Sequence, residues 1–297
     1  MEILQSLPQF YQSPVALDSS RHACLGISPS PTGFSFAAKA QSVILAGVEF
    51  FEAGREFPII FSQTENGRML PVALLGLERE ENLFVDGQGG WQGSYIPAYI
   101  RRYPFINTEG GTMAVCFDEF FDGFNAPESV PLFQDGGPSQ KLKEITEFLK
   151  DYYQQMKRTE ELGALLAQAG LLKQIDAQVN LNDGRSFALN GMLVVDEERL
   201  NMLPDVDLVR LFRSGMMALI HAHLLSLKSF GALLERKARR GAAAPVQEEA
   251  AAEAVAEAVA LAEAEAEAAA LAEAEAEAVE LEAELAELEA EAVAIAL

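Results

Sequence analysis

Cysteine is scarce in this chain. Among 297 residues there are only two, Cys24 and Cys116, and each lies in an apolar stretch. Two cysteines are too few to cross-link a chain of this length, whereas small secreted domains held by disulfides carry many more. We therefore predict two reduced, buried thiols in a cytoplasmic protein rather than a disulfide or a reactive site.

Long apolar runs are also missing. The N-terminal residues, MEILQSLPQFYQSP, do not place a basic region before an apolar one, as a secretory signal peptide does. The longest apolar candidate, 216–227, is interrupted by His221, His223 and Ser226 and falls short of the roughly 20 residues that span a bilayer. The sequence predicts no membrane span.

Basic residues are absent from the C-terminal end. From Ala242 onward the chain has 16 glutamates and no lysine or arginine, which accounts for most of the net charge of −23. The body before it keeps 29 acidic against 22 basic residues, a net charge of about −7. Because phosphate binding needs a basic surface, nucleic acid is not expected as a partner.

Motifs of several well-known chemistries are absent as well. The glycine-rich pieces 87–93 and 134–139 lack the lysine of a phosphate-binding loop and are interpreted as turns, and no G-x-S-x-G nucleophile motif occurs. His221 and His223 are two residues apart on a predicted helix, roughly 200° around its axis, so they do not suit a shared metal ion. We predict no metal site and no cofactor, with one histidine at a polar edge and the other packed against a sheet.

Acidic residues cluster in FDEFFDGFN at 117–125. If this segment turns, Asp118 and Asp122 could face one another as an acid–base pair or bind a divalent cation. The ladder of oxygen ligands found in an EF-hand loop is missing. We favour a solvated acidic turn flanked by buried phenylalanines.

Short strands and turns dominate the first half of the chain. Residues 40–52 have apolar positions at helical spacing and predict a short helix. Two hairpins are predicted along the chain, because the dipeptides Asn66-Gly67 and Asp183-Gly184 each separate two β-type runs. These runs are 57–61 with 69–77, and 175–181 with 185–189; a further strand is expected at 192–196.

Helical patterns dominate the second half. A long helix is predicted from Pro138 to Gly170 and a last body helix from Pro204 to Glu235. The sequence VDEERL at 195–200 is typical of a helix start, because its acids would lie near the positive end of the helix dipole.

Together these elements predict an α+β fold: a mainly β body, a helical C-terminal half and a low-complexity Ala/Glu tail that favours helix. We place the body at 1–240, as a single unit, and the linker and acidic tail at 241–297.

The segment 82–105, NLFVDGQGGWQGSYIPAYIRRYPF, has the most unusual composition. It holds the only tryptophan of the chain, in a turn-rich stretch with several tyrosines and an arginine pair. One interpretation is a ligand-binding wall of Trp91, Tyr95 and Tyr99. An arginine of the pair, Arg101 or Arg102, would then recognise a carboxylate or a phosphate.

A structural interpretation of the same arginine pair is the one we favour. In it, an arginine stacks on an aromatic ring and pairs with an acid of the body, such as Asp86 or Glu81.

Several pieces of the sequence occur in an order and spacing that resemble the bacterial SapC-like family. They are FPIIF, LPVALLGL, NLFVD, W-x-G-x-YIPAYIRRYPF, LFQDGGPSQKL, and DG-x-x-FALNGMLVVDEERL with a closing LLSL helix, and they cover roughly residues 5–235. Members of this family are often encoded beside genes for outer-membrane nutrient uptake. The resemblance therefore implies an accessory role, and it implies no catalytic residue.

Three functions are compatible with these observations. The first is a non-enzymatic accessory or binding protein of the cytoplasm, linked to envelope transport or nutrient uptake, with a small molecule or a protein as its partner. The second is an enzyme or small-molecule sensor with a pocket around Trp91–Tyr103. The third is a surface-layer structural protein, which the missing export signal disfavours. The sequence indicates no oligomeric state.

The acidic tail yields a prediction of its own. Its glutamates recur four residues apart, as at Glu263 and Glu267, and each such like-charge pair costs a helix roughly 0.2–0.5 kcal/mol. Because protonation removes the repulsion, the helicity of a 246–297 peptide is expected to rise as the pH falls from 7 towards 4. Far-ultraviolet circular dichroism measures this, and a signal that stays flat over this pH range would contradict the prediction.

Overall fold

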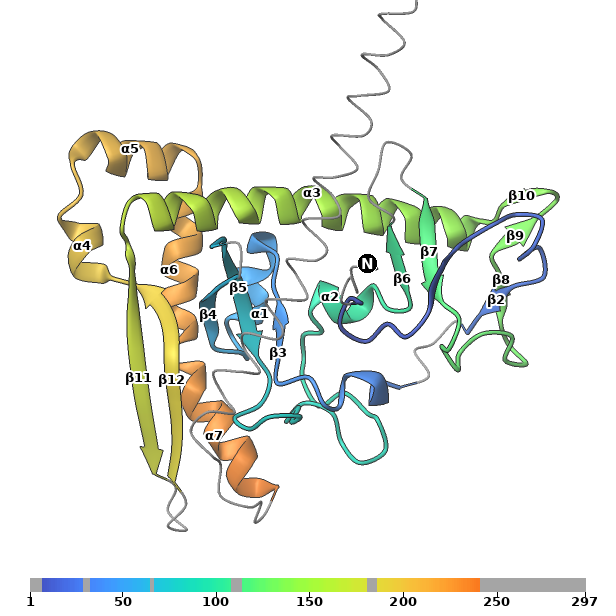
Figure 1. The fold of residues 1–297 in the computed structure, drawn as a ribbon, viewed down its shortest axis with the longest axis horizontal. Coiled ribbons are helices and arrows are strands. Elements are labelled where there is room, and N and C mark those ends of the chain that lie inside the picture. Colours follow the sequence, from blue (N-terminus) through green and yellow to red (C-terminus); the bar gives the residue numbers. More distant parts are fainter. Residues whose placement is uncertain (1–6, 29–32, 65–66, 108–113, 181–185, 241–297) are drawn as a thin grey trace, which may run out of the picture.

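The computed structural model describes residues 7–28, 33–64, 67–107, 114–180 and 186–240. The Ala/Glu tail predicted from the sequence lies outside these residues. Strands and helices are both abundant in the described part, so the predicted α+β class is confirmed (Figure 1).

Most strands are short, in keeping with the frequent turns of the first half. They are β1 (Pro14–Ala16), β2 (Gly26–Ile27), β3 (Ser42–Ile44), β4 (Ile59–Gln63), β5 (Met69–Leu74), β6 (Phe105–Asn107), β7 (Val115–Asp118), β8 (Val130–Pro131), β9 (Phe133–Gln134), β10 (Gly137–Pro138), β11 (Leu172–Asn180) and β12 (Ser186–Val195).

The helices are concentrated in the second half, as predicted. They are α1 (Phe50–Ala53), α2 (Ala98–Arg101), α3 (Gln140–Gln168), α4 (Glu197–Asn201), α5 (Asp205–Arg213), α6 (Met216–Ser226) and α7 (Ser229–Arg239), with the 3-10 turns η1 (Ser35–Ala37) and η2 (Gly47–Glu49).

A five-stranded sheet with the order β11-β12-β4-β5-β3 forms the larger half of the body. Both predicted hairpins are confirmed, since β4 pairs antiparallel with β5 and β11 pairs antiparallel with β12. The separate strand expected at 192–196 is wrong, because β12 runs without a break from Ser186 to Val195.

A three-stranded sheet, β1-β7-β6, forms the smaller half. Its strands pack their apolar side chains, such as Phe105 and Phe117, into a separate small core. The larger core surrounds the five-stranded sheet.

The helix predicted at 40–52 is wrong. Ser42–Ile44 forms β3 at one edge of the larger sheet, and only the following residues turn into η2 and α1. Val43 and Ile44 point to opposite faces of a strand, and both are buried. A short apolar run that is buried on both faces suits a strand as well as a helix, and the helical spacing alone does not separate them.

Helix α3 joins the two halves of the body. It begins where predicted, with the Ser139 hydroxyl accepting a hydrogen bond from the Leu142 amide, and the chain leaves it through Gly170 in the left-handed conformation. Leu142 and Leu149 of its first half enter the smaller core, whereas Leu162 and Leu166 enter the larger one. Figure 1 shows α3 running over both sheets.

Gly163 permits the closest approach between α3 and the larger sheet. A Cβ atom at this position would lie 1.8 Å from the carbonyl oxygen of Met69 at the start of β5. Four residues earlier, the Thr159 hydroxyl accepts a hydrogen bond of 2.7 Å from the Gly47 amide of η2. A glycine and a threonine on the same side of α3 thus fix its distance from the sheet.

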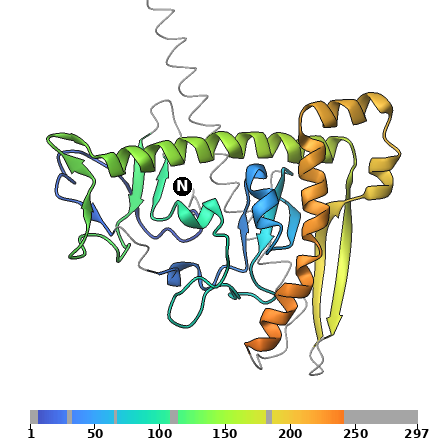
Figure 2. The same cartoon turned by 180° about the vertical axis from the view of Figure 1, so that it is seen from behind.

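The single helix predicted from 204 to 235 is wrong, because the structure divides it into three. Gly215, with φ of 78°, separates α5 from α6, and a short break at 227–228 separates α6 from α7. Figure 2 shows α6 and α7 aligned end to end on one face of the molecule.

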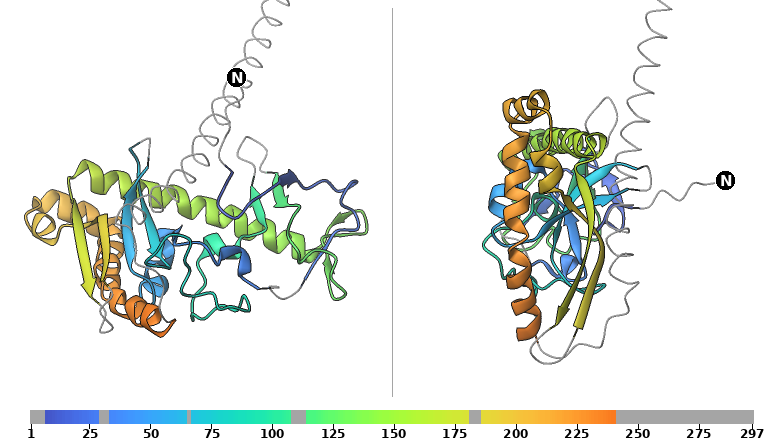
Figure 3. Two further views of the ribbon diagram at one scale, coloured as in Figure 1. Left: turned by 60° about the horizontal axis from the view of Figure 1, so that its bottom comes forward. Right: turned by 90° about the vertical axis from the view of Figure 1, so that its left-hand side faces the viewer.

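This rod, Met216–Arg239, is long and apolar enough to cross a membrane by length and composition, which the sequence reasoning had not indicated. Core helices of soluble proteins meet the same criterion. Within the structure the rod covers one face of the larger sheet (Figure 3), and it buries His223, Ser226 and Lys237.

His223 joins the rod to two strands of the larger sheet. Strands β12 and β4 are in register at Leu193 and Phe61, so Val195 lies opposite Ile59. There the imidazole stands between the strands: Nε2 accepts from the Val195 amide at 3.1 Å, and Nδ1 donates to the Ile59 carbonyl at 3.0 Å. The Ser226 hydroxyl accepts from the Ile59 amide at 3.0 Å. Side chains of α6 thus replace ladder hydrogen bonds that the two diverging strands cannot make.

The bridging role requires a neutral imidazole, which leads to a pH-dependence prediction. Burial lowers the pKa of His223 from its ordinary value of 6.5 to about 4. Because the folded pKa lies below the unfolded one, the stabilisation is complete above pH 6.5 and is lost as the pH falls from there towards 4. A gap of this size corresponds to about 3 kcal/mol.

The measurement compares the wild type with His223→Gln, whose amide also donates and accepts but does not titrate. Urea unfolding is expected to show that the stability difference between the two shrinks by about 3 kcal/mol between pH 7 and pH 4. Identical pH dependences for the two proteins would contradict the bridging role of a neutral His223.

Candidate functional site

The aromatic segment 82–105 folds back on itself and on the core. The Trp91 ring packs on Phe84 with a centroid distance of 5.8 Å, and its Nε1 donates to the Tyr95 carbonyl at 2.8 Å. The glycine-rich piece before it forms a turn, as predicted, with the Asp86 carboxylate accepting from the Gln88 and Gly90 amides at 2.8 Å each. The polar end of the tryptophan is therefore occupied within the segment.

Two glutamates beside α1 hold the middle of this segment. Buried Glu49 accepts from the Tyr95 hydroxyl at 2.8 Å and from the Ala98 amide at 2.7 Å. Glu56 accepts from the Ser94 and Tyr95 amides at 2.8–3.0 Å. Burial raises the pKa of Glu49. The hydrogen bonds that Glu49 accepts from Ala98 and Tyr95, together with the charge of Arg101, oppose the rise. Sequence reasoning missed both residues, although a glutamate inside the apolar run VEFFEA was a visible signal.

Arg102 lies inside the protein, enclosed by tyrosine rings. Its guanidinium carbon is 4.0 Å from the centroid of Tyr99, 5.3 Å from that of Tyr152 and 5.9 Å from that of Tyr11. The rings come from α2, α3 and the N-terminal segment, and only 6% of Arg102 is exposed. A desolvated cation over aromatic faces is stabilised by their quadrupoles, so Arg102 links three separate parts of the fold.

Arg101 lies on the surface. Its Nε donates to the Ile96 carbonyl at 2.9 Å, and its guanidinium lies 5.3 Å from the Phe148 ring and 5.9 Å from the Tyr95 ring. The two neighbouring arginines thus occupy different environments, one exposed and one buried. The structure does not bring them together over a common wall with Trp91.

The acids suggested as partners of the arginine pair bind other groups. Asp86 holds the glycine-rich turn, and Glu81 lies 2.6 Å from Nζ of Lys237. Lys237 is 1% exposed and lies 2.6 Å from Glu78 as well. Of the favoured interpretation, the stacking on aromatic rings is confirmed. Asp86 and Glu81 are engaged by other groups, and the pairing of an arginine with an acid of the body stays a prediction.

Asp118 is fully buried, and the expected solvated acidic turn is wrong. Its carboxylate accepts from the Gln12 amide at 2.9 Å, from the Ser13 amide at 3.0 Å and from the Tyr103 hydroxyl at 3.2 Å. Asp122 is exposed. The buried carboxylate fastens the N-terminal segment to β7, and burial together with this carboxylate raises the pKa of Tyr103.

The predicted placement of the two histidines, one at a polar edge and one against the sheet, is confirmed. His221 is exposed, and His223 is buried against the sheet. Within the described ranges, no group of three or more His, Cys, Asp or Glu side chains is arranged to hold a metal ion. Both cysteines are free; Cys116 is buried as expected, but Cys24 is exposed.

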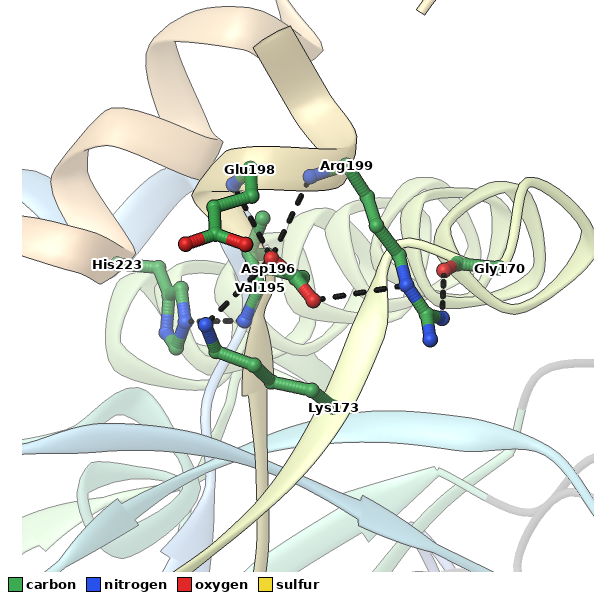
Figure 4. Close-up of polar contacts among 7 residues, drawn as sticks. All are labelled: Gly170, Lys173, Val195, Asp196, Glu198, Arg199 and His223. Carbon is green, nitrogen blue, oxygen red and sulfur yellow. Dashed lines mark hydrogen bonds and ion pairs between the residues drawn. The ribbon is translucent and has the colours of Figure 1, made fainter. Parts of the chain in front are cut away.

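Asp196 marks the predicted helix start, which is confirmed (Figure 4). Its carboxylate accepts from the Glu198 and Arg199 amides at the first turn of α4, and Lys173 Nζ lies 3.4 Å away. Arg199 also donates to the Gly170 carbonyl at 2.7 Å. Burial raises the pKa of Asp196, but these donors and the charge of Lys173 outweigh it and hold the pKa below the ordinary value. The cluster ties β11, β12, α3 and α4 together.

Two groups of large apolar side chains are left exposed. The α5 face consists of Met202 (74% exposed), Val206 (73%), Val209 (47%) and Phe212 (75%). The α1 patch consists of Val48 (62%), Phe51 (56%) and Leu225 (62%). Most of these residues lie in the two helices predicted at 40–52 and 204–235, and the apolar spacing there did not reveal either exposed surface.

Comparison with protein families gives one match. A family model described as SapC matches residues 17–233, which include the aromatic segment, Asp118, Asp196 and His223. Comparison with curated proteins and with solved structures gave no match.

The different environments of the two arginines generate a prediction. Arg102→Ala removes a buried cation from three rings and leaves a cavity, so it is expected to lower the free energy of unfolding by about 2 kcal/mol or more. Arg101→Ala removes only surface contacts and should cost less than about 1 kcal/mol. Urea denaturation measures both.

Arg102→Lys serves as a control that keeps the charge but loses the planar stacking group, and its stability is expected to lie between those of the wild type and Arg102→Ala. Equal losses for Arg101→Ala and Arg102→Ala would contradict the structural assignment.

Proposed function

The chain belongs to the SapC family, and from that premise we propose that it is a non-enzymatic accessory protein that binds a protein partner in envelope transport or nutrient uptake. The single observation that carries the proposal is the α1 patch, the exposed apolar side chains of η2, α1 and α6.

The use of the polar residues within the fold supports a binding role. Glu49, Asp118 and Asp196 accept hydrogen bonds from backbone amides, and His223 bridges two strands. Each of these side chains is positioned by a contact that the fold itself needs, and the family resemblance supplies no catalytic residue. Groups that stabilise buried backbone in this way are costly to divert to a reaction.

The α1 patch has the composition of a protein contact. Phe51 lies on α1, which packs against α6, the helix that carries Leu225, and Val48 lies on η2, which contacts α1. Glu52 and Arg55, which are exposed and paired at 3.5 Å, supply charge at the edge of the patch. An apolar centre with a charged rim is the usual anatomy of a protein interface.

A small-molecule site near Trp91–Tyr103 is a second candidate, supported by one observation. Arg101 presents a solvent-exposed guanidinium beside the rings of Tyr95 and Phe148. A planar anion could bind such a group. Trp91, Tyr99 and Arg102 are turned towards the core or are buried, so this site would use only a part of the predicted wall.

The test of the proposed function is photo-crosslinking in the cells that make the protein. A photoreactive side chain at Phe51 is expected to form an adduct with a second, different polypeptide, which mass spectrometry identifies as a component of envelope transport. The matched control is Phe120, a phenylalanine 62% exposed on the β7–β8 connection, which should give no such adduct. The proposal fails if position 51 gives no adduct, gives the same adducts as position 120, or captures only proteins unrelated to the envelope.

A further inference from the structure

The α5 face lies at an outer corner of the molecule. Leu211 is the fully buried anchor of α5, and the helix packs on α6. Its other side carries Val206, Val209 and Phe212 at three-residue intervals, which places them along one stripe of the helix. Figures 1 and 3 show α5 beyond the end of α3, with its outer side away from the sheets.

Exposure of this stripe to water is unfavourable for a monomer. Phe212 and Val206 are about three-quarters exposed, and so is Met202 at the end of α4. Burial of such side chains against another apolar surface is favourable, because it removes them from water. Contiguous exposed apolar residues on an ordered helix are therefore typical of a contact surface.

The charges of α5 are divided between its two ends. Asp205 and Asp207 lie in the first turn, and Arg210 and Arg213 lie in the last. In the part of the chain that the structure describes, none of these four side chains takes part in an ion pair. Asp205 and Arg213 lie four residues on either side of Val209 and so on the same side of the helix as the stripe, whereas Asp207 is two residues from Val209 and lies roughly 200° around the axis. The stripe is thus flanked by an acid at one end and a base at the other.

This arrangement is complementary to itself. We propose that the α5 face pairs with the α5 face of a second copy, antiparallel and about a two-fold axis near Val209. Reversal of one helix about Val209 places Val206 beside Phe212 of the other copy, and it places Asp205 of one helix beside Arg213 of the other. A two-fold interface of this kind needs only one self-complementary surface.

Other occupants fit less well. A parallel pair would set acid beside acid and base beside base, and would align the two helix dipoles unfavourably. A membrane surface rich in anionic lipid would be attracted by a basic helix, whereas α5 carries two acids and two bases. The acidic tail would meet Asp205 and Asp207 with the same charge. Opposite charges meet at both ends of the helix only in the antiparallel self-contact.

The dimer is independent of the partner contact proposed at the α1 patch, because the two surfaces consist of different residues. Loss of one contact would leave the other unaffected, so the experiments below and the crosslinking at position 51 can fail separately.

The first test is sedimentation velocity on the full chain over a wide range of concentrations. The wild type is expected to shift from monomer to dimer as its concentration rises, and Phe212→Glu is expected to remain a monomer throughout. Phe120→Glu, which changes another exposed phenylalanine far from α5 in the sequence, should dimerise like the wild type. A wild type that stays monomeric, or a dimer that Phe212→Glu leaves intact, would overturn the proposal.

The second test fixes the orientation by disulfide trapping in a Cys24→Ser background, which removes the exposed native thiol. Val209→Cys alone is expected to form a covalent dimer on oxidation, because this residue faces its own copy across the axis. Val206→Cys and Phe212→Cys should each crosslink poorly alone and efficiently when the two variants are mixed. Disulfides need Cα atoms within about 7 Å, so this pattern reports the register.

Circular dichroism is the control that checks whether each variant keeps its fold. Efficient self-crosslinking of Val206→Cys and of Phe212→Cys would indicate a parallel pair and overturn the proposal. Absence of crosslinking for Val209→Cys would also overturn the proposal. This result is expected if the tail or another protein covers α5.

Discussion

The contact of α3 with the larger sheet is the constraint on which the rest of the structure depends. At Gly163 the helix comes so close to Met69 that no side chain fits between them. One turn away Thr159 fixes η2, and η2 ends at Glu49, which holds the segment leading into α2. The first half of the same helix supplies Tyr152 to the rings around Arg102. The two cores, the aromatic segment and the buried arginine are therefore all positioned by one helix.

A second regularity concerns the buried polar side chains. His223, Ser226, Asp118 and Glu49 each accept from a backbone amide that no neighbouring strand or helix satisfies. A buried amide without a partner costs on the order of 1–3 kcal/mol, so these side chains are structural acceptors wherever the short strands end or diverge. A chain with many short strands has many such ends, which explains why so much of its polar chemistry is directed inward.

The predictable parts of this fold are those specified by local signals. The dipeptides Asn66-Gly67 and Asp183-Gly184 correctly predicted the pairing of the strands on either side of them, and Gly170 correctly predicted the end of α3, because turn and cap chemistry acts over a few residues. Asp118 was misjudged because its partners lie about a hundred residues away, at Gln12 and Ser13. The stacking of Arg102 on aromatic rings was predictable, because the aromatic residues near it are visible in the sequence. Its burial was not, because it depends on Tyr11 and Tyr152 from other elements. The exposure of the α5 face could not be predicted, because an apolar stripe on a helix predicts a buried surface but does not identify what buries it.

The α6–α7 rod shows why composition alone misleads here. An amphipathic helix on a core normally turns apolar residues inward and polar residues outward. This rod buries His223, Ser226 and Lys237 among acceptors and acids, while Leu225 points outward. The strands and the loop with Glu78 and Glu81 now satisfy the polar side chains of the rod. A rod that crossed a bilayer would lose these partners, and unsatisfied polar groups are costly in hydrocarbon. The inner side of the rod is therefore explained by the assembly of the sheet, and Leu225 is the large apolar side chain that the rod leaves exposed.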